Sequence, residues 1–292
     1  MVLGGHFWSA QGGTQVGSVI VNCATGVLAR YYHRYARFLA GHGCDVLTYD
    51  YRGIGESRPD RLRGCGYRWR EWGTRDFEAV LRFMHARRPG ATIAVVGHSI
   101  GGFLPGLAPS APLIARMLTV GAQYAWWGDY AVSARLRLFA KWHVAMPALT
   151  ALLGYFPGRK LGWLEDLPAG VANEWSFRRP RFEDSFPPAD HQSARERMSA
   201  VTAPILAVSL RDDEIGTLAA VRRTLAYYTG AGRILIHPAP SDFGRKAVGH
   251  FALFHDSYAD DFWAGTLQWL RYGRNPWPDL TVPVTPSSRK PR

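Results

Sequence analysis

The chain has 292 residues, 47% of them hydrophobic, which is enough to bury one large core, so we expect a single domain with an insertion. Its formal net charge of +12 favours anionic partners, but the arginines are dispersed and no zinc-finger or RNA-binding motif accompanies them, so nucleic-acid binding is not expected. The three cysteines are odd in number and lack metal-ligand spacing, which argues against a disulfide framework and a metal site and indicates a reducing compartment.

Short apolar segments alternate with segments of helical period along most of the chain. This alternation is typical of an α/β fold in which helices cover both faces of a mostly parallel central sheet. Apolar residues recur at helical spacing over residues 28–39 and 77–84, and both stripes are expected to face the sheet. The predicted strands cover residues 18–23, 45–50, 92–97, 117–122, 204–210 and 233–237.

Residues 126–200 interrupt this alternation, because they are rich in aromatic residues, prolines and arginines and contain no convincing strand. We expect them to form a helical cap on a core made of residues 1–125 and 201–274. The aromatic side chains either line a pocket under the cap or only pack it onto the core, and both alternatives stay open. They are Trp126, Trp127, Trp142, Phe156, Trp163, Trp175, Phe177, Phe182 and Phe186. Residues 275–292 are proline-rich and basic, which predicts a tail without regular structure.

No segment of the sequence indicates secretion or a membrane span. Residues 1–10 lack a basic stretch followed by an apolar core, so no secretory signal is expected. The longest uncharged apolar run, residues 144–157, is too short to span a bilayer and contains Pro147, so it predicts a buried or interfacial segment. We therefore expect a cytoplasmic protein, with weak contact to a membrane surface as an open alternative.

Ser99 lies in the segment GHSIGG, residues 97–102, which follows a predicted strand and precedes apolar residues at helical spacing. A Gly-x-Ser-x-Gly match in that context predicts a nucleophile elbow, a strained turn that exposes the serine above the sheet edge. A side chain at Gly97 or Gly101 is expected to collide with the neighbouring strand or helix. Ser99 is therefore the candidate nucleophile.

The same turn places Ser99 at a helix N-terminus, where unpaired amides favour developing negative charge. The Ile100 amide is the first expected oxyanion donor. The second is expected from the loop after the first predicted strand, as the amide of Ala24 or of Thr25. The alternative is that this loop is an ordinary turn between a strand and a helix.

A serine hydroxyl needs a base to take its proton, and the chain offers ten histidines. His250 lies in a glycine-marked loop after the last predicted strand and before an apolar helical segment, which makes it the candidate base. His98 lies inside the elbow and is expected to point away from the pocket. His255 is the nearest alternative candidate for the base, but it is expected to be an ordinary surface histidine.

The third member of such a triad is a carboxylate at a strand end between the serine and the histidine. Asp212, Asp213 and Glu214 follow the predicted strand at 204–210. Asp213 falls where the turn presents its acid, whereas Asp212 is expected to point to the other side. The two remaining acids would cap the following helix.

Residues 50–57, DYRGIGES, are dense in charge and glycine, which is also common around catalytic groups. We interpret them as architecture. The glycines permit a tight turn after a strand, and Asp50 and Arg52 are expected to hold loops near the site through hydrogen bonds and an ion pair.

The motifs GHSIGG, DYRGIGES, the acid turn after PILAVSL and GHFALF occur in this order. They resemble those of the α/β-hydrolase superfamily, in particular the bacterial serine aminopeptidase-like and monoglyceride-lipase-like group. The resemblance extends over residues 4–271 and implies the α/β-hydrolase fold with a triad of Ser99, Asp213 and His250. Residues 1–8 match only the second strand of the opening hairpin usual in that fold.

The resemblance implies hydrolysis of an ester, thioester or amide through an acyl-enzyme, with neither a cofactor nor a metal. We expect ester hydrolysis, and the aromatic insertion favours a small to medium acyl or aryl ester as the small-molecule substrate. Acyl transfer by the same triad and thioester or amide cleavage are the alternatives. A non-catalytic ligand receptor is disfavoured because all three triad positions are filled, and the oligomeric state is left open.

Overall fold

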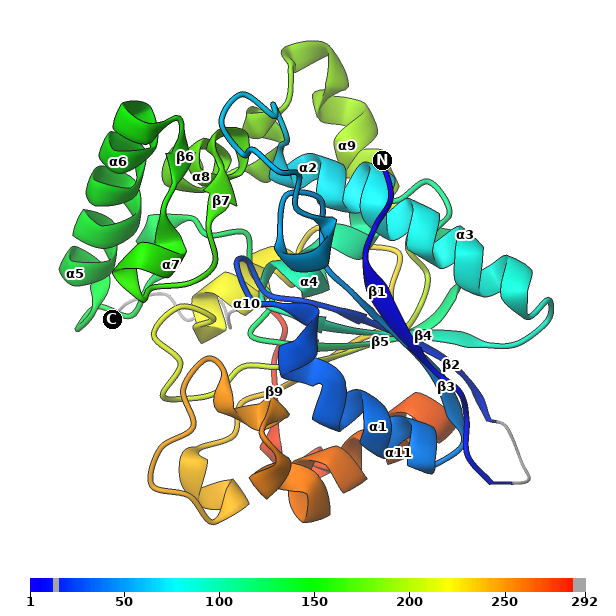
Figure 1. Ribbon diagram of the computed structural model, residues 1–292. Helices are drawn as coiled ribbons and strands as arrows, with labels where there is room; N and C mark the ends of the chain where they lie inside the picture. Colours follow the sequence, from blue (N-terminus) through cyan, green and yellow to red (C-terminus); the bar gives the residue numbers. More distant parts are fainter. Residues whose placement is uncertain (13–15, 286–292) are drawn as a thin grey trace.

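The computed structural model describes residues 1–12 and 16–285, and in this part of the chain its centre is an eight-stranded sheet (Figure 1). The strand order is β1-β3-β2-β4-β5-β8-β9-β10, in which only the two edge strands, β1 and β10, run antiparallel to their neighbours. The strands are β1 (Gly5–Trp8), β2 (Gly17–Asn22), β3 (Cys44–Tyr49), β4 (Ile93–His98), β5 (Ile114–Val120), β8 (Ile205–Val208), β9 (Arg233–Ile236) and β10 (Thr281–Val282).

The six strands predicted from apolar runs are all present, with ends that differ by at most three residues. Every residue of β4 and of β8 is buried, because helices cover both faces of the sheet. The mostly parallel, helix-flanked sheet is therefore confirmed. At one edge of the sheet, β1 pairs antiparallel with β3.

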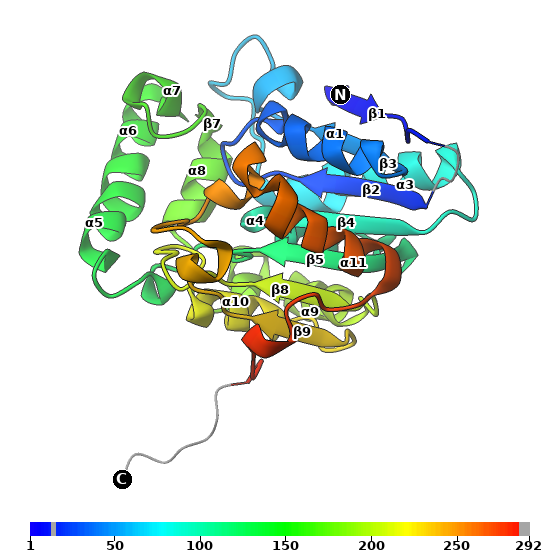
Figure 2. The same cartoon turned by 90° about the horizontal axis from the view of Figure 1, so that it is seen from below.

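Helices α1 (His33–Gly41) and α11 (Ala264–Tyr272) lie on one face of the sheet, whereas α3 (Glu78–Arg87) and α9 (His191–Ser199) lie on the other (Figures 1 and 2). The two predicted apolar stripes are buried within α1 and α3, as expected. The remaining core helices are α2 (Trp69–Glu71), α4 (Ile100–Phe103) and α10 (Leu218–Leu225).

Residues 126–200, predicted as the cap, are mostly helical, but their last helix, α9, lies on a face of the sheet with the core helices. Helices α5, α6, α7 and α8 lie together beyond the carboxyl ends of the parallel strands (Figure 2). They span Arg135–Phe139, Met146–Leu153, Gly158–Leu161 and Ala169–Ser176. Two short strands, β6 (Tyr155–Phe156) and β7 (Leu167–Pro168), pair antiparallel, which the sequence did not predict. None of the described helices has the length and apolar character that a bilayer crossing requires.

The expectation of a tail without regular structure is wrong for part of residues 275–292. Strand β10 pairs with β9, and the Arg222 guanidinium donates hydrogen bonds to the Pro283 carbonyl. The physical reason is that β9 would otherwise present an open edge, which the β-branched pair Thr281 and Val282 covers. Residues 286–292 lie outside the described residues.

Candidate active site

The nucleophile elbow forms between β4 and α4. Ser99 has φ 55° and ψ −125°, a conformation that costs a non-glycine residue energy and is found at functional turns. A Cβ atom at Gly97 would lie 2.4 Å from the Gly102 Cα, and one at Gly101 would lie 2.4 Å from the Asn22 carbonyl oxygen. The two glycines therefore have the steric role that the sequence predicted.

His250 and Asp213 form a buried pair at 2.6 Å between Nδ1 and Oδ2, with side chains 7% and 2% exposed. The other carboxylate oxygen accepts the amides of Ile215 and Gly216 at 2.8 and 2.7 Å. Burial alone would raise the pKa of Asp213, but the imidazole and these hydrogen bonds outweigh it and lower the pKa. The ionised carboxylate accepts from Nδ1–H, so Nε2 is left as the basic nitrogen. Gly121 (φ +56°) leaves room for the pair, since a Cβ there would approach Asp213 Oδ2 to 2.9 Å.

The two neighbouring acids have other roles. Asp212 Oδ2 accepts the amides of Val248 and Gly249 at 2.7 and 3.0 Å, so it braces the loop that carries the histidine. Glu214 pairs with Arg137 of the cap at 2.5 Å. The expectation that these acids cap the next helix is wrong, because the Thr217 hydroxyl accepts the capping hydrogen bond at the start of α10.

Gln123 is a contact of the nucleophile that the sequence analysis missed. Its Nε2 donates a hydrogen bond to Ser99 Oγ at 3.0 Å, and its Oε1 accepts the amide of Ala125. The amide nitrogen of Ala125 can only donate, which fixes the carboxamide with its nitrogen toward Ser99. A usable signal was present, because Gln123 follows the carboxyl end of β5, where open α/β sheets place ligands.

Ser99 and His250 line one cavity, but no direct hydrogen bond joins their side chains among the described residues. The structure therefore brings the three triad positions to one place and forms one of the two triad hydrogen bonds. Catalytic hydrogen bonds are often long until a substrate is bound.

The two amides proposed for the second oxyanion donor differ in their partners. The Ala24 amide donates to the Tyr32 hydroxyl at 3.0 Å, so it is occupied. Within residues 1–12 and 16–285, no hydrogen bond is formed by the amides of Thr25 or Ile100, and both residues line the cavity. This difference favours Thr25 over Ala24 as the partner of Ile100.

A hydrogen-bond chain behind the elbow connects the loop that carries Ala24 to the loop that carries His250. The Tyr32 hydroxyl lies 2.7 Å from His98 Nδ1, and His98 Nε2 lies 2.8 Å from the His250 carbonyl oxygen. The carbonyl only accepts, so Nε2 carries the proton and Nδ1 accepts from Tyr32. Burial lowers the pKa of His98 to about 3, which keeps the ring neutral. His98 points away from the cavity, as the sequence predicted, but it positions both loops.

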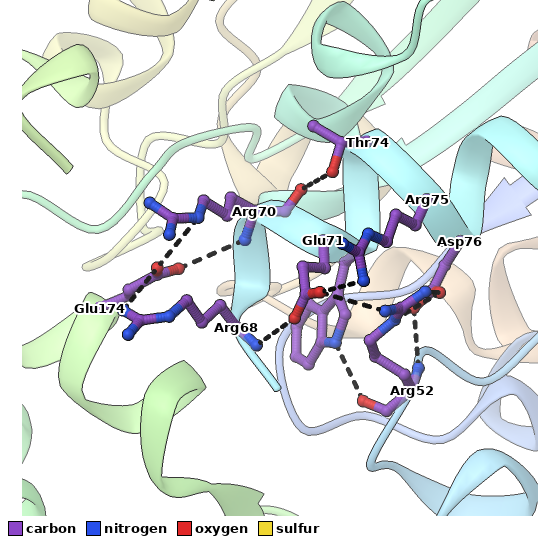
Figure 3. A network of polar contacts seen from close by, with 9 residues as sticks. Arg52, Arg68, Arg70, Glu71, Thr74, Arg75, Asp76 and Glu174 are labelled. Carbon is purple, nitrogen blue, oxygen red and sulfur yellow. Dashed lines mark hydrogen bonds and ion pairs between the residues drawn. The ribbon is translucent and has the colours of Figure 1, made fainter. Parts of the chain in front are cut away.

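Residues 50–57 are architecture, and Arg52 and Asp50 form an ion pair and hydrogen bonds to neighbouring loops, as expected. Arg52 Nε donates to Asp76 Oδ1 at 2.7 Å, and Glu71 lies 3.3 Å from Arg52 Nη1 (Figure 3). Asp50 accepts the backbone amide of Ala29 at 2.7 Å. The charged side chains of this segment therefore tie loops together beside the site and do not line the cavity around Ser99.

The cavity has a volume of about 570 Å³ and lies between the core and the cap. Three of the insertion's tryptophans, Trp142, Trp163 and Trp175, line it, so the pocket-lining alternative holds for them. Phe156 and Phe182 are fully buried and only pack the insertion. Among the described residues no three His, Cys, Asp or Glu side chains come together as metal ligands.

Comparison with known proteins identifies the family. Residues 17–185, more than half of the chain, match the serine aminopeptidase family S33. The chain belongs to this family. It is thus a serine hydrolase of the α/β-hydrolase fold, and the match includes the elbow and most of the insertion but ends before Asp213 and His250. No curated protein matches the sequence.

Solved structures share the fold at low sequence identity. A monoacylglycerol lipase from Paleococcus ferrophilus has a TM-score of 0.60 at 14% identity, over 94% of this chain and 100% of that chain. A soluble variant of the monoglyceride lipase from Saccharomyces cerevisiae, in complex with a substrate analog, has a TM-score of 0.66 at 16% identity, over 92% and 91%. An esterase from Exiguobacterium antarcticum has a TM-score of 0.56 at 13% identity, over 92% and 95%.

Proposed function

We propose that this protein hydrolyses a carboxylic ester through an acyl-enzyme, with Ser99 as nucleophile, His250 as general base and Asp213 as the carboxylate that orients the imidazole. The observation that carries the proposal is the Asp213–His250 hydrogen bond of 2.6 Å beside the same cavity as the strained Ser99. An imidazole that is fixed in this tautomer presents a basic Nε2 to the serine hydroxyl.

The reaction follows from these positions. Ser99 Oγ attacks the ester carbonyl as His250 Nε2 takes its proton, and the amides of Ile100 and Thr25 donate to the oxyanion. The bond to the alcohol breaks, and the alcohol leaves with the proton from His250. Water then attacks the acyl-enzyme in the same way, which releases the acid and restores Ser99.

Two further observations favour an ester with an apolar part. The tryptophans in the cavity wall offer apolar surface to an acyl chain or an aryl alcohol. Solved proteins of this fold include enzymes named as a monoacylglycerol lipase, a monoglyceride lipase and an esterase. We therefore propose a small to medium acyl or aryl ester as substrate, with no cofactor in the reaction.

The test is a panel of p-nitrophenyl esters from acetate to palmitate, measured with the wild type and with Ser99→Ala. We expect the wild type to cleave at least one ester and Ser99→Ala to lose about a thousandfold or more in kcat. Ser257→Ala, at an exposed serine, is the matched control and keeps its activity. Hydrolysis that survives Ser99→Ala, or a wild type that does not react with a fluorophosphonate probe, contradicts the proposal.

Acyl transfer would use the same groups with an alcohol or amine in place of water. Adding such acceptors to the ester assay separates the two reactions, because transfer gives a new ester or amide and hydrolysis gives the free acid. We expect the free acid as the main product.

A further inference from the structure

Arg178 is a buried cation in the wall of the cavity that also holds Ser99 and His250. It follows α8 in the insertion, is 4% exposed and is among the residues that line the cavity. Arginine is almost never fully buried unless a carboxylate or another anion pairs with it. The burial of Arg178 therefore has to be explained by its contacts.

The contacts of Arg178 are with neutral groups. Nη1 donates to the Ser185 hydroxyl at 2.5 Å, and the guanidinium carbon lies 4.0 Å from the centroid of the Trp69 ring. Nε is buried and has no hydrogen-bond partner. Among residues 1–12 and 16–285, no carboxylate forms an ion pair with Arg178.

Glu174 is the acid whose charge acts on Arg178, but in the described part of the chain it forms no ion pair with Arg178, and its buried Oε1 has no hydrogen-bond partner. Oε1 lies 3.7 Å from Arg68 Nη1 and 3.8 Å from Arg70 Nε, and Oε2 accepts the Arg70 amide at 3.3 Å. Figure 3 shows Glu174 facing these two arginines. One carboxylate thus serves several arginines, and the guanidinium of Arg178 is left without a direct anionic partner.

Arg178 remains charged in spite of its burial. Desolvation lowers the pKa of Arg178 to about 9, which still leaves the guanidinium protonated at neutral pH. A buried charge without a direct anionic partner is strongly destabilising. A negatively charged ligand group in the cavity would supply that partner.

The other charges around the cavity add to the positive field. Arg30 and Lys141 also line it, and neither forms an ion pair in the described part of the chain. The Lys141 ammonium lies over two aromatic rings, at 4.5 and 4.4 Å from the centroids of Trp142 and Trp163. By contrast, both lining acids are paired with cap arginines, Glu165 with Arg159 and Glu214 with Arg137.

We propose that Arg178 binds a carboxylate on the substrate, so that the ester cleaved at Ser99 also carries a free carboxylate. Half-esters of dicarboxylic acids and acyl esters of hydroxy acids are the two forms of such a substrate. The guanidinium of Arg178 lines the cavity, and a guanidinium is the side chain that suits a carboxylate best in charge and geometry. This inference rests on the proposed ester hydrolysis, and it adds the chemical class of the substrate.

The test compares each charged ester with an uncharged ester of the same shape. Mono-p-nitrophenyl esters of succinate through suberate are measured against the same esters with the distal carboxylate replaced by a carboxamide. Butyryl esters of hydroxy acids and of the corresponding hydroxy amides are measured in the same way. The chain length that gives the best charged substrate then reports how far Arg178 lies from Ser99.

We expect the wild type to cleave the best charged ester with a kcat/KM at least about tenfold above that of its carboxamide, because a hydrogen bond to a charged group is worth about 1.5–3 kcal/mol. Arg178→Met brings this ratio to about one and still cleaves the carboxamide ester, and Arg178→Lys keeps part of the ratio. Arg179→Met, at the exposed neighbouring arginine, leaves the ratio unchanged. A wild-type ratio at or below one in both series overturns the inference, even if Arg178→Met does not fold.

A binding measurement separates this inference from the proposed reaction. Free dicarboxylates should raise the Tm of the wild type and of Ser99→Ala but not that of Arg178→Met, whereas the diamides should raise none. If no ester is cleaved but this pattern holds, the proposed hydrolysis fails and the carboxylate site stands. If esters are cleaved without charge preference and the Tm does not move, the carboxylate site fails and the hydrolysis stands.

Discussion

The Gln123 carboxamide lies between the nucleophile and a strained turn, with Nε2 3.0 Å from Ser99 Oγ and Oε1 on the amide of Ala125. Ala125 has φ 63°, one of two positive values at non-glycine residues in the described chain. Because Ser99 Oγ accepts from Gln123, its own hydroxyl proton is free for another acceptor. In the proposed reaction His250 takes that proton, and the Gln123 N–H would then face developing negative charge on Oγ.

Replacing Gln123 by Glu should therefore slow catalysis. The substitution keeps the shape but removes the N–H donor, and a hydrogen bond to a charged group contributes about 1.5–3 kcal/mol, so we expect kcat to fall by roughly 10- to 100-fold with little change in KM. Steady-state kinetics on a p-nitrophenyl ester measure both values. Gln268→Glu, at an exposed glutamine, is the control. A Gln123→Glu enzyme with wild-type kcat would show that the contact has no role in catalysis.

Replacing Asp213 or Asp212 by asparagine should have clearly different effects on kcat. Asp213→Asn removes the charge that fixes the His250 tautomer, and we expect kcat to fall by about 10⁴-fold. Asp212→Asn keeps a carbonyl oxygen for the amides of Val248 and Gly249, so a loss of less than about tenfold is expected. The kcat values of the two purified variants decide the assignment. Equal losses would remove the argument for Asp213.

Local patterns were sufficient to predict the parallel strands and the elbow. Apolar runs identified the strands because both faces of the sheet are covered. The glycines around Ser99 indicated close packing at the turn, although the group that Gly101 must avoid, the Asn22 carbonyl, lies far away in the sequence. The choice of Asp213 over Asp212 followed from the place in the turn after the strand where this fold presents its acid, and the His250 contact agrees with it.

Features that depend on contacts between distant segments could not be predicted in this way. The sequence gives no reason to choose between the amides of Ala24 and Thr25 as oxyanion donor. The two differ because the Tyr32 hydroxyl, from the next helical segment, accepts a hydrogen bond from the Ala24 amide. The unpaired charge of Arg178 depends on which arginines reach Glu174 in the folded chain. Strand β10 is two residues long, too short for any periodic pattern to indicate it.

His98 should make the stability of the protein sensitive to acid. Burial lowers the pKa of His98 to about 3, whereas an unfolded histidine has a pKa of about 6.5. Between these values the unfolded chain binds the proton and the folded chain does not, so the free energy of unfolding falls as the pH falls, by up to about 1.4 kcal/mol per pH unit. The contribution of a neutral His98 is therefore complete above about pH 6.5 and declines below it.

The variant His98→Gln tests this dependence, since a glutamine can accept from Tyr32 and donate to the His250 carbonyl without titrating. We expect urea unfolding at pH 7, 6 and 5 to show a smaller loss of stability in His98→Gln than in the wild type. His255→Gln, at an exposed histidine, should follow the wild type. Parallel losses in all three proteins would rule out His98 as the titrating group.

The cap should bind weakly to anionic membranes. Val132, Leu136, Val144 and Leu152 are apolar and 55–82% exposed on or beside α5 and α6, and the protein has a formal net charge of +12. We expect co-sedimentation with phosphatidylserine vesicles that decreases from 0.1 M to about 1 M NaCl, since salt shortens the electrostatic range. Leu136→Ser with Leu152→Ser should reduce binding, whereas Phe83→Ser on α3 should not. Equal binding to neutral and to phosphatidylserine vesicles would contradict the expected contribution of the positive charge to membrane binding.

The two hydrogen bonds of the Tyr32 hydroxyl should stabilise the folded protein next to the site. It accepts from the Ala24 amide and donates to His98 Nδ1, so Tyr32→Phe leaves two buried polar groups without a partner. Each such group costs about 1–3 kcal/mol, so for the two groups we expect a loss of roughly 2–6 kcal/mol in the free energy of unfolding by urea. Tyr31→Phe is the matched control, because that hydroxyl donates to the Phe251 carbonyl at an exposed position and its loss should cost little. The kcat of Tyr32→Phe is measured at a temperature where the variant is folded. If Thr25 is the oxyanion donor, we expect this kcat to fall only moderately. A rise in kcat would instead mean that Tyr32 holds the true donor, the Ala24 amide, out of use.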